Sequence, residues 1–263
     1  METLESLLLG ILQGLTEFLP VSSSGHLVIA QSLLGTELGE GILFEVAVHM
    51  ATMIAILLFY RRRIGVLTLG AISANGDALR YIGKLFIGTL PVVTAALLAR
   101  DWIELQFESP TVVGICLLIT GGVVWSTRYT LGRGESVEPT WLGAFLIGCA
   151  QAVAILPGIS RSGSTVSVAL ALGLAPLAAA EFSFLLGVIA ISGAGVLLLP
   201  ELTTVSAPLL QTTAFGGTSA LLSGLVALWV FVWFLRARRF YLFAWYAWIV
   251  GAVTLIGFGF ATG

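Results

Sequence analysis

The chain has 263 residues, of which 58% are hydrophobic and only 10% are charged, and its mean hydropathy is +1.04. A soluble domain carries about a quarter charged residues, so this composition excludes an ordinary water-soluble globule. The net charge of −2 and the scattered basic residues argue against a nucleic-acid partner, which requires a basic face. The sequence therefore predicts an all-α, polytopic membrane protein that forms one integral membrane domain over residues 1–263.

Six stretches are apolar over enough residues to form transmembrane helices, which need about 20 residues each. They lie at roughly 42–60, 84–99, 111–128, 183–200, 212–235 and 240–262.

Two further apolar regions, residues 4–34 and 141–174, are each interrupted near the middle by proline and a serine/glycine cluster, at 20–25 and 157–163. Non-helical backbone at membrane depth is tolerated only where it is buried in protein or lines a wet cavity. We therefore expect two re-entrant helix–loop–helix hairpins whose tips meet inside the protein.

The basic residues predict the orientation of the chain. If the ends near residues 61–63 and 236–239 are cytoplasmic, as the positive-inside rule requires, ten of the twelve Lys and Arg residues lie inside. Arg100 then lies outside, Arg161 lies within the second hairpin, and the loop at 101–104 and both termini are extracytoplasmic.

An internal repeat relates the two hairpins. A shift of 138 residues aligns them without a gap and gives ten identities over positions 8–44, among them paired Gln, Ser and Gly residues. Three predicted spans separate the hairpins, so the second copy is inverted relative to the first. The repeats cover about 1–128 and 139–263, an inverted-topology architecture typical of transporters.

Ionisable residues within membrane segments are costly and are therefore functional candidates. In this chain they are Glu17, His26, Glu45, His49, Arg161 and Glu181. We interpret Glu45 and Glu181 as residues that either function in the site or brace a hairpin, and His49 as a packed or hydrogen-bonded helix residue. Tyr246 belongs to an aromatic cluster that we interpret as an interfacial belt.

The repeat brings two polar clusters together. One holds Gln13, Glu17, Ser22, Ser23, Ser24 and His26, and the other holds Ser160, Arg161, Ser162, Ser164 and Thr165. Each serine cluster opens the second helix of its hairpin, where free N–H groups and the helix dipole favour an anion. Arg161 adds a fork suited to phosphate oxygens. The pattern predicts a phosphate or diphosphate site.

The same residues are able to perform chemistry. A hydroxyl or imidazole could attack phosphorus while Glu17 orients a proton carrier or accepts the proton. Alternatively, Glu17 helps to hold a divalent cation, because carboxylate oxygens suit Mg²⁺ or Ca²⁺. The sequence contains no cysteine cluster and no pair of histidines at metal-ligand spacing.

Two long segments resemble the undecaprenyl-diphosphate phosphatase family of bacitracin-resistance (BacA/UppP) type. They are QGLTEFLPVSSSGH over residues 13–26 and PGISRSGST over residues 157–165. The similarity extends over essentially the whole chain, including FEV at 44–46 and EFSFLL at 181–186. Members of that family are integral membrane hydrolases that convert undecaprenyl diphosphate to the monophosphate, recycling the lipid carrier for peptidoglycan and other cell-envelope polymers.

The resemblance implies roles for particular residues. The family's acidic motif falls on Gln13 and Glu17, so one carboxylate that many members carry is replaced here by an amide. The active-site serine and histidine of the family fall on Ser23 and His26. Its arginine motif falls on Ser160, Arg161 and Thr165. The resemblance also implies a plasma-membrane location, a site that opens extracytoplasmically and help from Mg²⁺ or Ca²⁺; a homodimer is left open.

Our interpretation is a lipid-diphosphate phosphatase whose catalytic residues are Glu17, Ser23, His26 and Arg161. The polyprenyl tail would lie in an apolar groove while the diphosphate reaches the hairpin tips. Ser23 is favoured as nucleophile with His26 as general base, and direct attack by His26 or by water stays open. The alternative is a lipid-phosphate flippase or anion transporter, which the inverted repeat favours.

Overall fold

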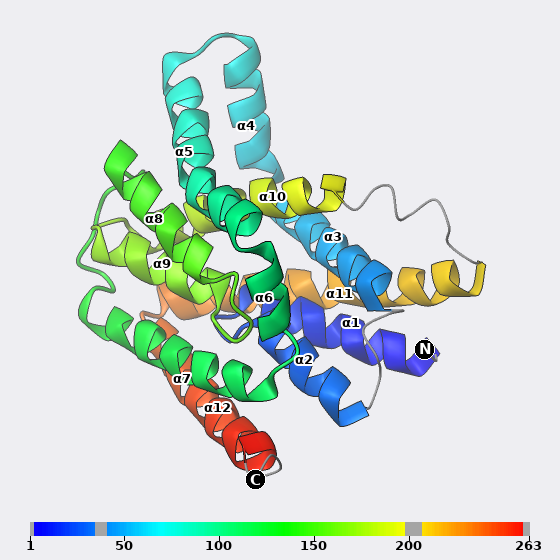
Figure 1. Cartoon of the computed structure of the whole chain (residues 1–263). Helices are drawn as coiled ribbons and strands as arrows, with labels where there is room; N and C mark the ends of the chain where they lie inside the picture. Colours follow the sequence, from blue (N-terminus) through cyan, green and yellow to red (C-terminus); the bar gives the residue numbers. More distant parts are fainter. Residues whose placement is uncertain (1–2, 35–40, 198–206, 260–263) are drawn as a thin grey trace.

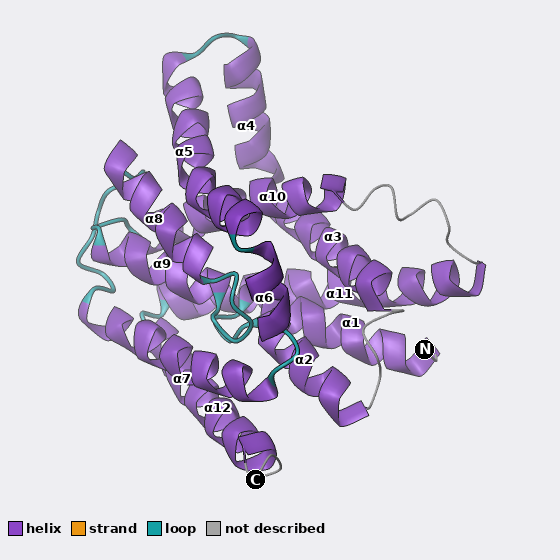
Figure 2. Ribbon diagram, viewed as in Figure 1, coloured by secondary structure: helices purple, strands orange, loops and turns teal. Residues whose placement is uncertain are grey.

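A computed structural model describes residues 3–34, 41–197 and 207–259 of the chain. Within these ranges every regular element is a helix (Figure 2), and strand-like pairing is limited to one isolated bridge between Ser136 and Leu174. The elements are α1 (Thr3–Phe18), α2 (Ser23–Leu34), α3 (Gly41–Phe59), α4 (Arg61–Ile72), α5 (Gly76–Leu98), α6 (Arg100–Gln106), α7 (Pro110–Ser126), η2 (Thr127–Tyr129), α8 (Trp141–Val153), α9 (Arg161–Ala171), α10 (Pro176–Leu197), α11 (Ala207–Arg236), η4 (Phe240–Leu242) and α12 (Phe243–Gly259).

Five helical segments in the described part of the chain are long and apolar enough to cross a membrane, or six if α3 and α4 count as one bent span. The five are 76–98, 110–129, 176–193, 211–236 and 240–258. The all-helical, multi-span fold class is therefore confirmed. The predicted spans at 84–99 and 183–200 begin too late, because α5 and α10 each start several residues earlier.

Two segments differ from expectation. The first apolar helix, α3, ends at Phe59, directly before the arginines as expected, but after a bend of 78° the chain continues as a further helix, α4, which packs against α5 and projects with it from the body of the molecule (Figure 1). The expected loop at 101–104 is wrong, since these residues form α6. An ion pair between Arg100 Nε and Glu104 Oε1 at 2.7 Å, at i,i+4 spacing, supports this short polar helix.

Each predicted hairpin packs on a helix from the other half of the chain. Helix α1 packs along α11, and α8 packs along α5. Glycines permit both close crossings: a β-carbon at Gly10 would lie 2.2 Å from the Gly216 carbonyl oxygen, and one at Gly148 would lie 2.1 Å from the Gly88 carbonyl oxygen. Gly10 and Gly148 are related by the 138-residue shift. Small residues let membrane helices approach closely in this way.

A row of buried aromatic rings packs against the end of α1, next to the tip of the first hairpin. Phe18, at the end of α1, meets the ring of Phe184 edge-on at 5.7 Å. Phe184 contacts Phe231 at 4.9 Å, and Phe231 contacts Phe240 at 5.2 Å. All four side chains are fully or almost fully buried. Edge-to-face pairs stabilise beyond their buried area, so α1 ends against a rigid platform.

Candidate active site

The tip of the first hairpin presents an acid and a hydroxyl. Glu17 lies in the last turn of α1 and is buried, and Gln13, one turn earlier, donates from Nε2 to its Oε2 at 3.0 Å. The chain then turns through Ser22, whose φ is +69°, so that α2 begins at Ser23. This turn brings Ser23 Oγ to 2.5 Å from Glu17 Oε2, where the hydroxyl donates to the carboxylate.

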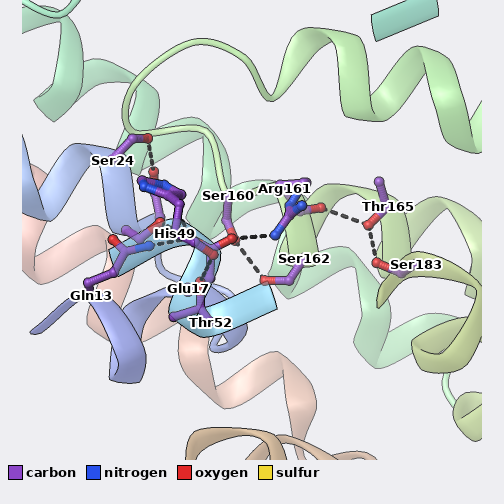
Figure 3. A network of polar contacts seen from close by, with 12 residues as sticks. Gln13, Glu17, Ser24, His49, Thr52, Ser160, Arg161, Ser162, Thr165 and Ser183 are labelled. Carbon is purple, nitrogen blue, oxygen red and sulfur yellow. Dashed lines mark hydrogen bonds and ion pairs between the residues drawn. The ribbon is translucent and has the colours of Figure 1, made fainter. Parts of the chain in front are cut away.

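The tip of the second hairpin presents a cation. Ser160 is the N-cap of α9, and its Oγ accepts from the Gly163 amide at 3.1 Å. Thr120 of α7, a helix outside the hairpin, stabilises this tip through two hydrogen bonds. Its hydroxyl donates to the Gly158 carbonyl at 2.7 Å and accepts from the Ser160 amide at 3.0 Å. Arg161 is therefore the first residue of a capped helix and points toward the first hairpin (Figure 3).

The two tips meet directly, as the repeat predicts. The Gly158 amide donates to Ser22 Oγ at 3.1 Å, and Ser162 Oγ donates to the Leu19 carbonyl at 3.2 Å. Arg161 Nη2 forms an ion pair with Glu17 Oε1 between the hairpins (Figure 3). Both residues are largely withdrawn from solvent, so this pair is only weakly screened.

A glycine in helix α10 leaves room for the Arg161 side chain. A β-carbon at Gly187 would lie 2.4 Å from Arg161 Nη1, so only glycine leaves room for the guanidinium in this position. Thr165 anchors α9 to the same helix, because its Oγ1 lies 2.5 Å from Ser183 Oγ and donates to the Arg161 carbonyl at 2.7 Å.

A polar cavity of about 230 Å³ lies between the tips. Its lining includes Glu17, Ser22, Ser23, Ser24, Ser160 and Arg161 together with His49, Phe107, Ala154, Ile155, Ile159, Ala190 and Ile191. A second cavity of about 500 Å³ shares Ser24, His49, Phe107 and Ile191 with the first. The rest of its wall is formed by the apolar residues Leu27, Val28, Val46, Met50 and Gly195 and by two acids, Glu45 and Glu104. The arginine, carboxylate and hydroxyl groups of the first cavity thus lie beside a larger cavity whose wall is mostly apolar.

Of the residues predicted for the site, some lie outside the cavity wall. Gln13, Ser162 and Thr165 contact wall residues or the opposing hairpin instead, and Ser164 is buried in α9. The roles assigned to these residues stay predictions.

His26 makes its contacts away from Ser23. Its Nδ1 lies 2.7 Å from the Ser22 carbonyl and its Nε2 lies 2.9 Å from the Tyr246 hydroxyl, and it does not line the polar cavity. Both ring nitrogens are thus hydrogen-bonded, to Ser22 and Tyr246, and neither contacts Ser23. A general-base or nucleophilic role for His26 stays a prediction.

His49 is a hydrogen-bonded helix residue, as the sequence predicts, and it also faces the candidate site. It lines both cavities, and its Nε2 lies 3.8 Å from Glu17 Oε2. Its Nδ1 lies 2.8 Å from the Glu45 carbonyl, which can only accept, so Nδ1 carries the hydrogen. The hydrogen-bonded interpretation is therefore confirmed, and a role of His49 in the site, which its ionisable character inside an apolar span indicates, stays a prediction.

The other intramembrane acids have structural partners. Glu45 Oε1 accepts from Gln31 Nε2 at 2.8 Å, which ties α3 to the second helix of the first hairpin. Glu181 Oε1 accepts from Arg63 Nε at 2.8 Å and from the Tyr81 hydroxyl at 3.2 Å. The contact of Glu45 agrees with the bracing interpretation, while its place in the wall of the larger cavity keeps a role in the site as a prediction, and Glu181 joins α10 to α4 and α5.

The donors around Glu17 do not by themselves make a cation site. Within the described ranges no three His, Cys, Asp or Glu residues are grouped so that they could hold a metal. Both Glu17 oxygens already accept hydrogen bonds, from Arg161, Ser23 and Gln13, although the buried Gln13 Oε1 has no partner. A resident ion held by protein ligands does not fit this arrangement.

Comparison with known proteins identifies relatives over almost the whole chain. Residues 6–253 match the family model described as bacitracin resistance protein BacA. A protein of Desulfosudis oleivorans named undecaprenyl-diphosphatase is 41% identical over 97% of this chain and 98% of its own length. Similarly named proteins of Desulforapulum autotrophicum and Methanosphaera stadtmanae are 37% and 33% identical, each over 97% of this chain and 98% of its own length.

Proposed function

The chain belongs to the family of bacitracin resistance protein BacA, and from this membership we propose that it is a membrane phosphatase that converts undecaprenyl diphosphate to undecaprenyl phosphate and inorganic phosphate. Such a reaction returns the lipid carrier to cell-wall synthesis and counters bacitracin. The substrate is a polyprenyl diphosphate lipid, taken from the surrounding membrane.

The joined cavities are the observation that carries this function. Their polar end combines an arginine, a carboxylate and serine hydroxyls at two helix N-termini, and the wall of the other end is mostly apolar, with Glu45 and Glu104 as its acidic members. A lipid diphosphate has the same distribution of polarity along its length. The diphosphate fits the end between Ser23 and Arg161, and the first part of the tail fits the end between α2, α3 and α10.

Ser23 is the nucleophile of the proposed reaction. Its Oγ attacks the terminal phosphorus, the bond from that phosphorus to the bridging oxygen breaks, and the electron pair leaves on the lipid monophosphate. Glu17, at 2.5 Å from Oγ, accepts the hydroxyl proton. Water then hydrolyses the phosphoserine, which releases inorganic phosphate, and the proton on Glu17 returns to Ser23.

Arg161 and the helix N-termini stabilise the charge on the transferring phosphoryl group. Arg161 pairs with Glu17, so the phosphates of the substrate compete with the carboxylate for the guanidinium. A phosphate that takes over Arg161 leaves Glu17 more basic as Ser23 attacks. The positive ends of α2 and α9 act in the same direction, because both helices begin at the cavity.

The divalent cation stays a proposal, in a restricted form. Mg²⁺ in phosphate sites is held by one or two carboxylates together with substrate phosphates. The protein donors alone do not fit a resident ion, so a dependence on Mg²⁺ or Ca²⁺ would enter with the diphosphate.

For the membrane arrangement we propose six spans and two re-entrant hairpins in an inverted repeat, in the plasma membrane with both termini outside. Contacts between the basic loops support a common cytoplasmic end: Lys84 Nζ lies 3.0 Å from Glu138 Oε1, and a β-carbon at Gly132 would lie 2.5 Å from Arg238 Cζ. Glu104, in the segment 101–104 expected outside, lines the larger cavity, and Phe107, three residues later, lines both cavities. This supports an extracytoplasmic opening.

Phosphate release from undecaprenyl diphosphate by the purified protein in detergent tests the function. We expect release by the wild type, loss in Arg161→Ala and Ser23→Ala, and retention in Ser167→Ala, a buried serine outside the cavity wall. Acid quenching should trap a phosphate on the peptide that contains Ser23. Turnover by Ser23→Ala would instead indicate attack by water or His26.

A flippase or anion transporter is the second candidate, because each hairpin packs on the opposite half of the chain as in inverted-repeat carriers. Well-folded protein that binds the lipid but releases no phosphate would reject the phosphatase and favour this alternative.

A further inference from the structure

Two aromatic side chains from opposite ends of the chain, His26 and Tyr246, form a stacked and hydrogen-bonded pair at the first hairpin. We call this pair the strut. The ring of Tyr246 in α12 stacks on His26 with centroids 5.6 Å apart and an interplanar angle of 13°. His26 Nδ1 donates to the Ser22 carbonyl at 2.7 Å, because a carbonyl can only accept. In the neutral ring Nε2 then accepts from the Tyr246 hydroxyl at 2.9 Å.

Through His26, the strut is hydrogen-bonded to a residue with a strained backbone, Ser22. Ser22 has φ +69°, a left-handed conformation that a residue with a β-carbon rarely adopts and that persists only when its surroundings enforce it. Ser22 also directs the tip: its Oγ accepts from the Gly158 amide of the second hairpin, and the next residue is Ser23. The strain is therefore located one residue before the proposed nucleophile.

The second hairpin provides an internal comparison. Ser160 occupies the position of Ser22 under the 138-residue shift, and its φ is −73°, an ordinary value. The position of His26 is occupied there by Ser164, which has no ring. The hairpin with the strained serine is thus the one with the strut.

We propose that Tyr246 is a positioning residue for the phosphatase reaction, acting through His26 to hold Ser22 in its left-handed conformation and so aim the Ser23 hydroxyl into the cavity. The inference rests on the proposed function. It gives His26 a mechanical role, and it gives a site role to a tyrosine that composition alone places in an interfacial belt.

The Tyr246→Phe variant tests the strut, because it removes one hydroxyl and keeps the ring. We expect kcat to fall about tenfold with KM changed by less than about twofold, since one hydrogen bond that orients the nucleophile is lost. Tyr241→Phe is the matched control: its ring contacts Trp125 and takes no part in the strut, so kcat should be retained.

A second comparison separates positioning from general loss of structure. Glycine adopts a positive φ without strain, so in a Ser22→Gly background, whatever its own activity, Tyr246→Phe should lower kcat by less than about twofold. An equal loss of kcat in both backgrounds, or an unchanged kcat in Tyr246→Phe alone, would overturn the proposal.

Hydrogen exchange of the segment 20–27 provides a readout independent of turnover. We expect faster exchange in Tyr246→Phe and no change in Tyr241→Phe. If the wild type released no phosphate while exchange still responded in this way, the proposed function would fail and the strut would stand. Unchanged exchange in Tyr246→Phe would reject the strut itself.

Discussion

The two hairpins share a backbone design but divide the chemistry between them. In the first, the Gly25 amide donates to Ser22 Oγ at 3.4 Å; in the second, the Gly163 amide donates to Ser160 Oγ at 3.1 Å. These residues correspond under the 138-residue shift. Paired serines and glycines therefore hold both helix N-termini at the cavity, whatever else each hairpin carries.

The reactive positions differ between the hairpins. Glu17 corresponds to Ile155, and Ser23 corresponds to Arg161. The acid and the hydroxyl thus lie on one hairpin and the cation on the other, and the ion pair between them exists only because the tips meet. Two copies of either hairpin would lack part of this set, so the proposed reaction depends on the asymmetry between the copies.

The flanking helices show the same complementary division. His49 corresponds to Gly187, which leaves room for Arg161, and Val46 corresponds to Phe184. Val46 lines the larger cavity, whereas Phe184 is a buried ring that packs on other aromatic side chains. In the proposed function, only the copy with the cavity would receive the lipid tail.

The largest effect is expected from Glu17→Gln, with the same substitution to glutamine at the corresponding position, Ile155, as its control. Glu17→Gln removes the proton acceptor and leaves Arg161 without its carboxylate, so kcat should fall by about a thousandfold. Ile155→Gln changes the equivalent position in the cavity wall and should cost less than about fivefold. Steady-state phosphate release measures both, and comparable losses would show that the hairpins contribute alike.

A smaller loss is expected where space for the arginine is removed. In Gly187→Ala the new methyl would overlap the guanidinium, so kcat/KM should fall by about 10- to 100-fold through misplacement of Arg161. Gly193→Ala lies on the same helix, where a β-carbon meets open space, and should be neutral. Retained activity in Gly187→Ala would mean that Arg161 works from another position.

Replacing Val46 by phenylalanine, the residue at the corresponding position of the second copy, should selectively affect substrates with long prenyl tails. Val46→Phe places a ring in the larger cavity, so KM for undecaprenyl diphosphate should rise by about tenfold through lost burial of the tail. A short-chain prenyl diphosphate should show little change, since it does not reach that wall. An equal rise for both substrates would place the tail elsewhere.

The smallest effect is expected on stability when divalent cations are removed. Because the described donors do not fit a resident ion, chelation should leave the thermal midpoint of the lipid-free protein unchanged while it lowers turnover of the diphosphate. A midpoint that rises with Mg²⁺ in the absence of lipid would reveal a protein-held ion, since a ligand that binds only the folded state stabilises it.

Much of this arrangement could be predicted because its signals are local. Interrupted apolar runs located both hairpins, and the four-residue spacing of Gln13 and Glu17 predicted their shared helix face, which their hydrogen bond confirms. Arg161 and Glu17 were brought together by the repeat alone.

The remaining features depend on contacts between distant segments, which no local pattern encodes. His49 faces the cavity because α3 packs against α1 and α10, and Gly187 is informative only once Arg161 lies against it. Helix α6 was missed because its stability comes from an exposed ion pair rather than from an apolar face. The Tyr246 contact joins residues 220 positions apart.

The crossings at Gly10 and Gly148 have a consequence for how the protein is made. The first hairpin emerges from the ribosome early, yet the groove that receives it is on α11, near the end of translation. Until that helix is inserted, α1 lacks the surface along which it packs. Membrane insertases and chaperones would therefore meet this protein with its first hairpin exposed, and truncations before α11 should be degraded rather than accumulate as stable fragments.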